Sequence, residues 1–155
     1  MKVYDSNMLR NIAVLGHSGC GKTNLIEAIA YTSNLTNKIS KQNDKVNMTY
    51  TLGLVLVEYN NYKYNLLDTP GYFDFCGEVI SSLTASDAAI IVIDATTDIQ
   101  VGTEKSLELT EDVPKIMFIN KIDNEKSRYK DTLEILREQY GNKIVPMIRS
   151  EERRV

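Results

Sequence analysis

The sequence contains little cysteine, no long apolar run and no basic excess, and each shortage excludes a class of protein. Two cysteines among 155 residues cannot build a disulfide framework, so we expect reduced thiols, as in the cytoplasm. No apolar run approaches the roughly 20 residues that a membrane span needs, and no signal-peptide stretch opens the sequence. A net charge of −3 differs from the basic character of nucleic-acid-binding domains, so no direct sequence-specific contact with nucleic acid is expected.

What remains is the composition of an ordinary globular domain, with 43% hydrophobic and 25% charged residues. The length predicts a single domain over residues 1–155. Short apolar runs alternate with segments of helical spacing, which is typical of an α/β fold with a doubly wound, mostly parallel sheet. The expected strands are residues 11–15, 52–58, 62–67, 88–93, 115–119 and 144–148, and the expected helices are residues 22–31, 75–83, 101–111 and 127–140.

The connecting segments refine this fold. Asn60 and Asn61 tolerate positive φ and predict a tight hairpin, which adds one antiparallel edge strand to the sheet. Gly141 is expected to cap the last helix at its C-terminus. Residues 32–47 are polar and rich in serine, asparagine and lysine, so a mobile loop is expected there.

The first chemical motif lies between the first strand and the first helix. It reads Gly16-His17-Ser18-Gly19-Cys20-Gly21-Lys22-Thr23 and fits the pattern G-x-x-x-x-G-K-[ST]. Glycines let backbone N–H groups turn inward around phosphate oxygens, and a helix N-terminus favours an anion. Lys22 is expected to reach the β and γ phosphates, and Thr23 to bind Mg²⁺ through its hydroxyl. A chance glycine-rich turn would rarely stand between a strand and a helix.

The second motif, Asp68-Thr69-Pro70-Gly71, ends the strand at 62–67. Ligands of a doubly wound sheet sit at the C-terminal ends of its strands. Asp68 is therefore expected to hold Mg²⁺ through water, and the Gly71 N–H to contact a γ-phosphate. Taken alone, the motif would be explained equally well by an ordinary Pro-Gly turn.

The third motif, Asn120-Lys121-Ile122-Asp123, follows the strand at 115–119. Guanine presents N1–H and an exocyclic amine as neighbouring donors, and the Asp123 carboxylate accepts both. Adenine would leave that carboxylate unsatisfied, which costs roughly 1–3 kcal/mol or more for a charged group. Asn120 is expected to orient the loop and the base, and the stem of Lys121 to cover the base.

Together, in this order, the three motifs predict a P-loop NTPase of the G-domain type that binds GTP and GDP. A threonine in the polar loop should sense the γ-phosphate and complete the Mg²⁺ shell. Thr49 and Thr51 both precede the strand at 52–58, and each is equally well explained as a strand-favouring residue.

The chain resembles the translational GTPases, most closely the elongation factor G-like and ribosomal-protection branch. The stretches that carry the resemblance are residues 16–23, 64–75 (YNLLDTPGYFDF), 77–79, 82–83, 93–95, 103–104 and 118–123. It spans about residues 10 to 148. The resemblance implies Mg²⁺-dependent GTP binding, a GTP/GDP switch and ribosome-stimulated hydrolysis, with the ribosome as partner. The resemblance also favours Thr49 as the switch threonine and implies a structural role for His17. It implies that Lys22, Thr49 and Gly71 take part in the hydrolytic site.

The chain departs from that family at several points. Tyr72 stands where the family commonly has the histidine that positions the attacking water, and a phenol with a pKa near 10 is a poor base at neutral pH. Ser18 replaces an apolar residue, and the loop from Thr23 to Thr49 is short for the family. We therefore expect slow hydrolysis.

A G domain would continue beyond this chain with a last guanine-contacting loop and a last helix. We therefore expect a truncated G-domain core with an uncovered apolar face beside the first helix. Residues 1–10 are expected to fold over that face, or the chain to form a homodimer through it.

Two other functions stay open. The chain is alternatively a catalytically inactive nucleotide-binding or interaction module derived from such a factor. An ATP-using P-loop protein is disfavoured by Asn120 and Asp123.

A redox link between Cys20 and Cys76 is a weaker interpretation than two unpaired thiols.

Overall fold

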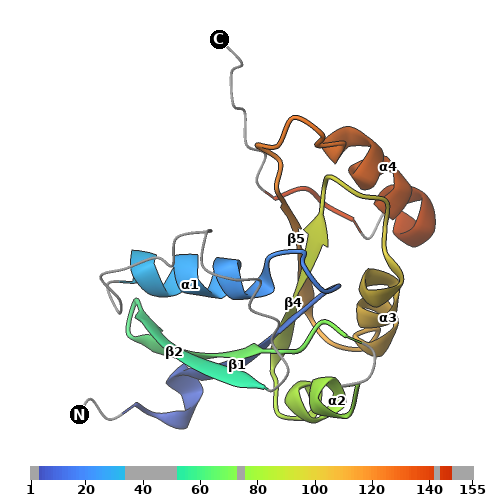
Figure 1. The fold of residues 1–155 in the computed structure, drawn as a ribbon. Helices are drawn as coiled ribbons and strands as arrows, with labels where there is room; N and C mark the ends of the chain where they lie inside the picture. The colour runs from blue at the N-terminus through green and yellow to red at the C-terminus, as the bar shows by residue number, and fades with distance from the viewer. Residues whose placement is uncertain (1–3, 34–51, 73–75, 142–143, 148–155) are drawn as a thin grey trace.

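The computed structural model describes residues 4–33, 52–72, 76–141 and 144–147 (Figure 1). Five strands form one sheet in the order β2-β3-β1-β4-β5. The strands are β1 (Leu9–Leu15), β2 (Gly53–Tyr59), β3 (Tyr62–Asp68), β4 (Ala88–Asp94) and β5 (Lys115–Asn120). The helices are the short 3-10 helix η1 (Ser6–Met8), α1 (Lys22–Thr32), α2 (Cys76–Thr84), α3 (Val101–Leu109) and α4 (Tyr129–Tyr140).

The sheet is mostly parallel, as the sequence predicts. β1 pairs in parallel with β3 and β4, and β4 pairs in parallel with β5. The β2–β3 pair is antiparallel, and its two turn residues, Asn60 and Asn61, have φ of 48° and 65°. Positive φ at both positions is typical of the hairpin turn whose twist matches that of the strands. The expected antiparallel edge strand is therefore confirmed.

Helices cover both faces of the sheet (Figure 1). On one face, Ile26 of α1 packs with Val14 of β1 and Val92 of β4. On the other face, α2 covers β1 through Val79, while α3 and α4 pack against β4 through Leu107 and Leu136. This two-sided arrangement is the predicted doubly wound fold. It explains why β4 reads as a continuous apolar run, since both of its faces are buried.

The predicted last strand is wrong over the residues that the structure describes, because residues 144–147 have no strand conformation. Pro146 lies in the middle of this segment, and proline has no N–H to donate to a neighbouring strand. The apolar side chains are not buried either, since Met147 is 82% exposed. Gly141, by contrast, caps α4 with φ 63°, as expected.

One face of β5 carries exposed apolar side chains. Ile116 pairs in register with Ile90, and Phe118 with Val92, so these side chains share the face that α1 covers farther along the sheet. Ile116 is 57% exposed and Phe118 is also exposed.

The expected N-terminal cover is wrong for the described residues 4–10. Leu9 extends β1 beside Lys63, and the Arg10 guanidinium lies over the Tyr62 ring, so this segment lies at the hairpin instead. Pairing with β3 gives the segment backbone hydrogen bonds that the distant β5 face does not offer.

Candidate functional site

The predicted motifs meet at one edge of the sheet because their strands are parallel. The phosphate-binding loop, residues 16–21, follows β1, and Asp68 ends β3. Asp94 ends β4 and Asn120 ends β5. The carboxyl ends of parallel strands lie on the same side, so four separate stretches of sequence contribute to one site.

The phosphate loop turns directly into α1. Gly21 is the N-cap residue of that helix with φ 99°, a left-handed conformation that glycine adopts at little cost. A Cβ at this position would lie 2.4 Å from the Asn120 amide nitrogen, so the loop and the end of β5 are in close contact. The N-terminus of α1, with its partial positive charge, therefore faces the site.

Lys22 is the first residue of α1 and is buried inside the loop. Its Nζ donates hydrogen bonds to the carbonyl oxygens of Gly16 and His17, each at 3.0 Å. Burial lowers the pKa of Lys22, whereas Cys20 and the Asp68 carboxylate act in the opposite direction. The amine is thus held inside the loop, where the negative charge of a bound phosphate would favour its protonated form and offset the cost of burial.

Thr23 and Asp68 are brought together from α1 and β3. The Thr23 hydroxyl donates to Asp68 Oδ2 at 2.7 Å. The other carboxylate oxygen, Oδ1, is buried and has no hydrogen-bond partner among the described residues. Burial raises the pKa of Asp68, and the Thr23 hydrogen bond and the Lys22 charge oppose that shift. An unsatisfied buried carboxylate oxygen beside a hydroxyl is suited to a hard cation.

Gly71 lies directly against the phosphate loop. A Cβ on Gly71 would come within 2.5 Å of Lys22 Nζ and 2.7 Å of the Ser18 backbone. No side chain fits there without moving the loop, which gives a physical reason for glycine in the second motif. Tyr72, the next residue, is exposed at the rim of the same site.

His17 contacts α3, a relation that the sequence did not suggest. A Cβ on Gly102 would lie 2.6 Å from His17 Nδ1. Burial lowers the pKa of His17, and the charge of Lys22 lowers it further. The imidazole therefore packs in the neutral form against the first turn of α3.

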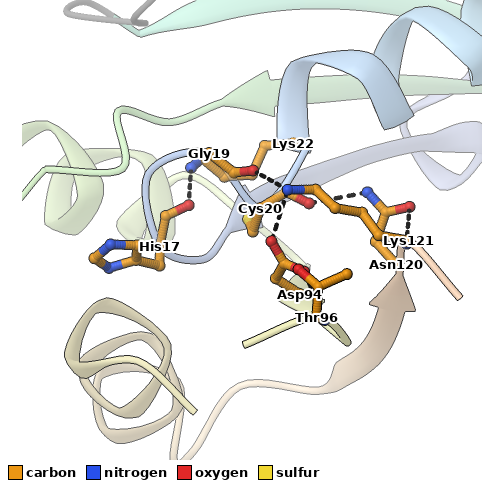
Figure 2. A network of polar contacts seen from close by, with 8 residues as sticks. All are labelled: His17, Gly19, Cys20, Lys22, Asp94, Thr96, Asn120 and Lys121. Carbon is orange, nitrogen blue, oxygen red and sulfur yellow. Dashed lines mark hydrogen bonds and ion pairs between the residues drawn. The ribbon is translucent and has the colours of Figure 1, made fainter. Parts of the chain in front are cut away.

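The loop after β5, residues 121–124, carries most of the predicted guanine motif and is called the guanine loop below. Two side chains join it to the phosphate loop (Figure 2). Asn120 Nδ2 donates to the Cys20 carbonyl at 2.9 Å, while its Oδ1 accepts from the Lys121 N–H at 2.9 Å. Lys121 Nζ donates to the Gly19 carbonyl at 2.8 Å and lies 2.6 Å from Asp94 Oδ2. The two loops therefore form one connected unit.

Asp94 is a member of this network that was not assigned to the site from the sequence. It is the last residue of the buried strand β4 at the same sheet edge, and that placement is the signal that could have identified it. The remaining predicted residues are less tightly held. Asp123 is exposed in the turn after β5, and Thr49 lies outside the described residues.

The two cysteines lie in different surroundings. Cys20 is buried in the phosphate loop, and Cys76 is exposed at the first residue of α2. Both are free thiols, so the structure contains no redox link between them.

Residues 7–151 match the family described as the elongation factor Tu GTP binding domain. The chain belongs to this family. The match covers most of the chain and confirms the G-domain fold that the three motifs predict.

Individual relatives agree with this assignment. The chain is 29% identical to an elongation factor G-like protein of Thermotoga maritima and 32% identical to elongation factor G of Gluconobacter oxydans. Each alignment covers 90% of this chain and 22% of the relative. The predicted resemblance to the elongation factor G-like branch is therefore confirmed, although the chain spans only about a fifth of the length of these relatives.

Solved structures give the same fold. A crystal structure of a Thermus thermophilus protein superposes with a TM-score of 0.77 at 31% identity, over 86% of this chain and 22% of that one. Translation elongation factor SelB from Methanococcus maripaludis, solved with the GTP analogue GppNHp, superposes with a TM-score of 0.68 at 25% identity. That alignment covers 84% of this chain and 26% of SelB. No helix in the described part of the chain combines the length and apolar character that crossing a membrane requires.

Proposed function

We propose that this domain binds GTP and GDP with Mg²⁺ and hydrolyses GTP slowly. One observation carries the proposal: Asn120 and Lys121 join the guanine loop to the phosphate loop at the same sheet edge as the Thr23–Asp68 pair. A nucleotide needs both loops at a fixed separation, because its base and its phosphates are bound at opposite ends. Here that separation is set by direct hydrogen bonds within the protein.

The phosphates are bound by the loop and by Lys22. Backbone N–H groups of residues 16–21 and the start of α1 provide donors and a positive field. The Lys22 amine exchanges its carbonyl partners for phosphate oxygens, to which charge-assisted hydrogen bonds are stronger than to carbonyls. Gly71 approaches the same loop closely enough for its N–H to contact a γ-phosphate.

Mg²⁺ fits the Thr23–Asp68 pair. Magnesium bound to nucleotides uses one or two protein oxygens and completes its shell with water and phosphate oxygens. The Thr23 hydroxyl provides one such oxygen and Thr49 is the proposed second, while the Asp68 carboxylate, with its unsatisfied Oδ1, holds the ion through water. When bound, Mg²⁺ neutralises charge on the β and γ phosphates.

Guanine is selected by Asp123. Its carboxylate is exposed in the turn after β5 and accepts from the N1–H and amine of guanine. Lys121 extends from the same turn toward Gly19, so its aliphatic stem covers the base.

Hydrolysis is slow because Tyr72 is a weak base at neutral pH. Lys22 stabilises developing charge on the γ-phosphoryl group, and Tyr72 orients the attacking water by hydrogen bonding. The water oxygen bonds to the γ-phosphorus as the bond to the β–γ bridging oxygen breaks, the water proton passes to a γ-phosphate oxygen because Tyr72 does not accept it, and GDP leaves. In the full-length relatives the corresponding domain belongs to elongation factors, so we propose that a ribosome accelerates the reaction.

The alternative function is a catalytically inactive nucleotide-binding or interaction module derived from such a factor. Tyr72 is the observation that favours it, because it stands directly after Gly71, where the family commonly has histidine. The predicted homodimer through the exposed Ile116 and Phe118 face would belong to such a module.

Parallel calorimetric titrations with GTP, GDP and ATP test the binding proposal. We expect both guanine nucleotides to bind at least about 100-fold more tightly than ATP, and EDTA to weaken GTP binding. Equal affinity for ATP would overturn the assignment of Asp123. A lack of any EDTA effect would overturn the Mg²⁺ assignment.

Single-turnover hydrolysis of γ-labelled GTP with and without ribosomes separates the enzyme from the inactive module. The enzyme is supported by a slow rate that Tyr72→His increases and Lys22→Ala abolishes. No phosphate release under either condition, with GTP binding intact, supports the module.

A further inference from the structure

Lys121 adopts a backbone conformation that requires support. Its φ is 59°, in the left-handed region, although its side chain is long and carries a Cβ. A residue other than glycine is unstable there by roughly 1–2 kcal/mol, so neighbouring contacts have to maintain it. The conformation turns the chain sharply after β5 and directs the amine back toward the phosphate loop (Figure 2).

Asp94 provides one such contact. Its Oδ2 accepts from Lys121 Nζ at 2.6 Å, and its Oδ1 accepts from both the backbone N–H and the hydroxyl of Thr96, at 2.9 and 2.6 Å. The residue is only 9% exposed. A carboxylate fixed by two donors on one oxygen cannot rotate freely, so it presents the other oxygen to Lys121 in a set direction.

The charge on Asp94 is retained although the residue is buried. Burial raises its pKa, but hydrogen bonds from Lys121 and Thr96 outweigh that effect, and the pKa lies below its ordinary value. The carboxylate therefore stays ionised and paired at neutral pH.

Lys121 passes this constraint to the phosphate loop. The amine that pairs with Asp94 also donates to the Gly19 carbonyl at 2.8 Å. The series of contacts runs from the end of β4, through the loop after β5, to the loop after β1. Asp94 lies at the far end of this series, and its contacts with Lys121 and Thr96 do not require a nucleotide.

We propose that Asp94 is a positioning residue for guanine-nucleotide binding, which holds Lys121 across to Gly19 and so keeps the guanine loop and the phosphate loop assembled before a nucleotide arrives. This inference rests on the proposed function, since it assigns Asp94 to the same site. The carboxylate acts through Lys121 and stays outside the contact shell of the nucleotide.

Asp94→Asn is the direct test because asparagine keeps the size of the side chain and an oxygen that can accept from Thr96, but removes the charge. We expect GDP affinity to fall about 10-fold, with most of the loss in faster dissociation, measured by stopped-flow release of a fluorescent GDP. Asp98→Asn is the matched control. Asp98 lies in the loop that follows Asp94, pairs with Arg128 and has a side chain that is 83% exposed, so we expect less than about a 2-fold effect.

A double-mutant cycle shows whether Asp94 acts through Lys121. In a Lys121→Ala background, Asp94→Asn should weaken GDP binding by less than about 2-fold, because the residue it positions is gone. An equal loss in both backgrounds would contradict the inference. So would an Asp94→Asn protein that unfolds at a lower temperature yet binds GDP with unchanged affinity, since that is a purely structural role.

Hydrogen exchange of the nucleotide-free chain separates this inference from the proposed function. Asp94→Asn should speed amide exchange at residues 16–21 and 120–124 and leave α4 unchanged. If the wild-type chain binds no guanine nucleotide, the proposed function and the nucleotide role of Asp94 both fail. Faster exchange in the Asp94→Asn variant would then still show that Asp94 keeps the two loops together. Unchanged exchange in that variant would contradict this role of Asp94 as well.

Discussion

The phosphate half and the guanine half of the site are built differently. On the phosphate side, Lys22, Asp68 and Cys20 are buried, and Gly71 approaches so closely that no side chain fits. On the guanine side, Asn120 and Lys121 are held by hydrogen bonds, but Asp123 is exposed. The phosphate half is thus shaped by close packing, whereas the guanine half is positioned by hydrogen bonds and leaves Asp123, the residue proposed to select guanine, accessible.

The two halves should therefore respond differently to substitution. A change in the packed half should disturb the loop itself and affect every nucleotide. A change at the exposed carboxylate should alter which base is preferred, since the carboxylate takes no part in holding the loops.

The largest effect is expected for Lys22→Ala. Removing the amine eliminates the charge-assisted hydrogen bonds to phosphate, so GTP and GDP affinity should both fall by at least about 100-fold in calorimetric titrations. Lys130→Ala, which removes an exposed lysine on α4, should leave both affinities unchanged. Tight GTP binding by the Lys22 variant would show that the loop backbone alone binds the phosphates.

Asp123→Asn should change base preference. We expect GTP affinity to fall by about 10- to 100-fold and xanthosine-nucleotide affinity to rise, because the amide can donate where the carboxylate only accepted. Competition of both nucleotides against fluorescent GDP measures the exchange of preference. Glu125→Gln, an exposed neighbour in the same turn, serves as the control. An equal loss of affinity for both nucleotides would contradict the proposal that Asp123 selects the base while other residues position the loops.

Gly102→Ala tests the packing of α3 against the phosphate loop. The added methyl group would lie 2.6 Å from His17 Nδ1, so we expect a loss of about 1–3 kcal/mol in the free energy of unfolding, measured in urea. Gly77→Ala in α2 meets open space and should instead stabilise the chain by about 0.5–1 kcal/mol. Combining Gly102→Ala with His17→Ala should recover part of the loss. No recovery would mean that the crowding lies elsewhere.

The smallest effect is a pH dependence from His17, the one histidine of the sequence. The pKa of His17 in the folded chain is lowered below the ordinary value of 6.5. As the pH falls through 6.5, the imidazole is therefore protonated in the unfolded chain before it is protonated in the folded chain. Stability should therefore decrease between about pH 7.5 and 5.5, and His17→Gln should remove that part of the decrease. An identical pH profile for both proteins would place the imidazole in solvent-like surroundings.

Much of the fold was predictable from local sequence. The continuous apolar run of β4 and the Asn60–Asn61 turn each have one favourable conformation, and both appear as expected. The segment at 144–147 was misjudged because its apolar residues suggested a strand, whereas Pro146 cannot take part in regular pairing. Apolar composition alone does not supply the hydrogen bonds that a strand needs.

The order of residues along the chain determines the family of this protein and the chemistry proposed for it, through a phosphate loop, a carboxylate after β3 and a guanine motif. The way those motifs are held together depends on the three-dimensional fold. Asp94 supports Lys121 and Gly102 packs against His17 across long sequence separations. Such contacts follow from the parallel order of the strands, which brings distant chain segments to one edge, and no local pattern of residues encodes them.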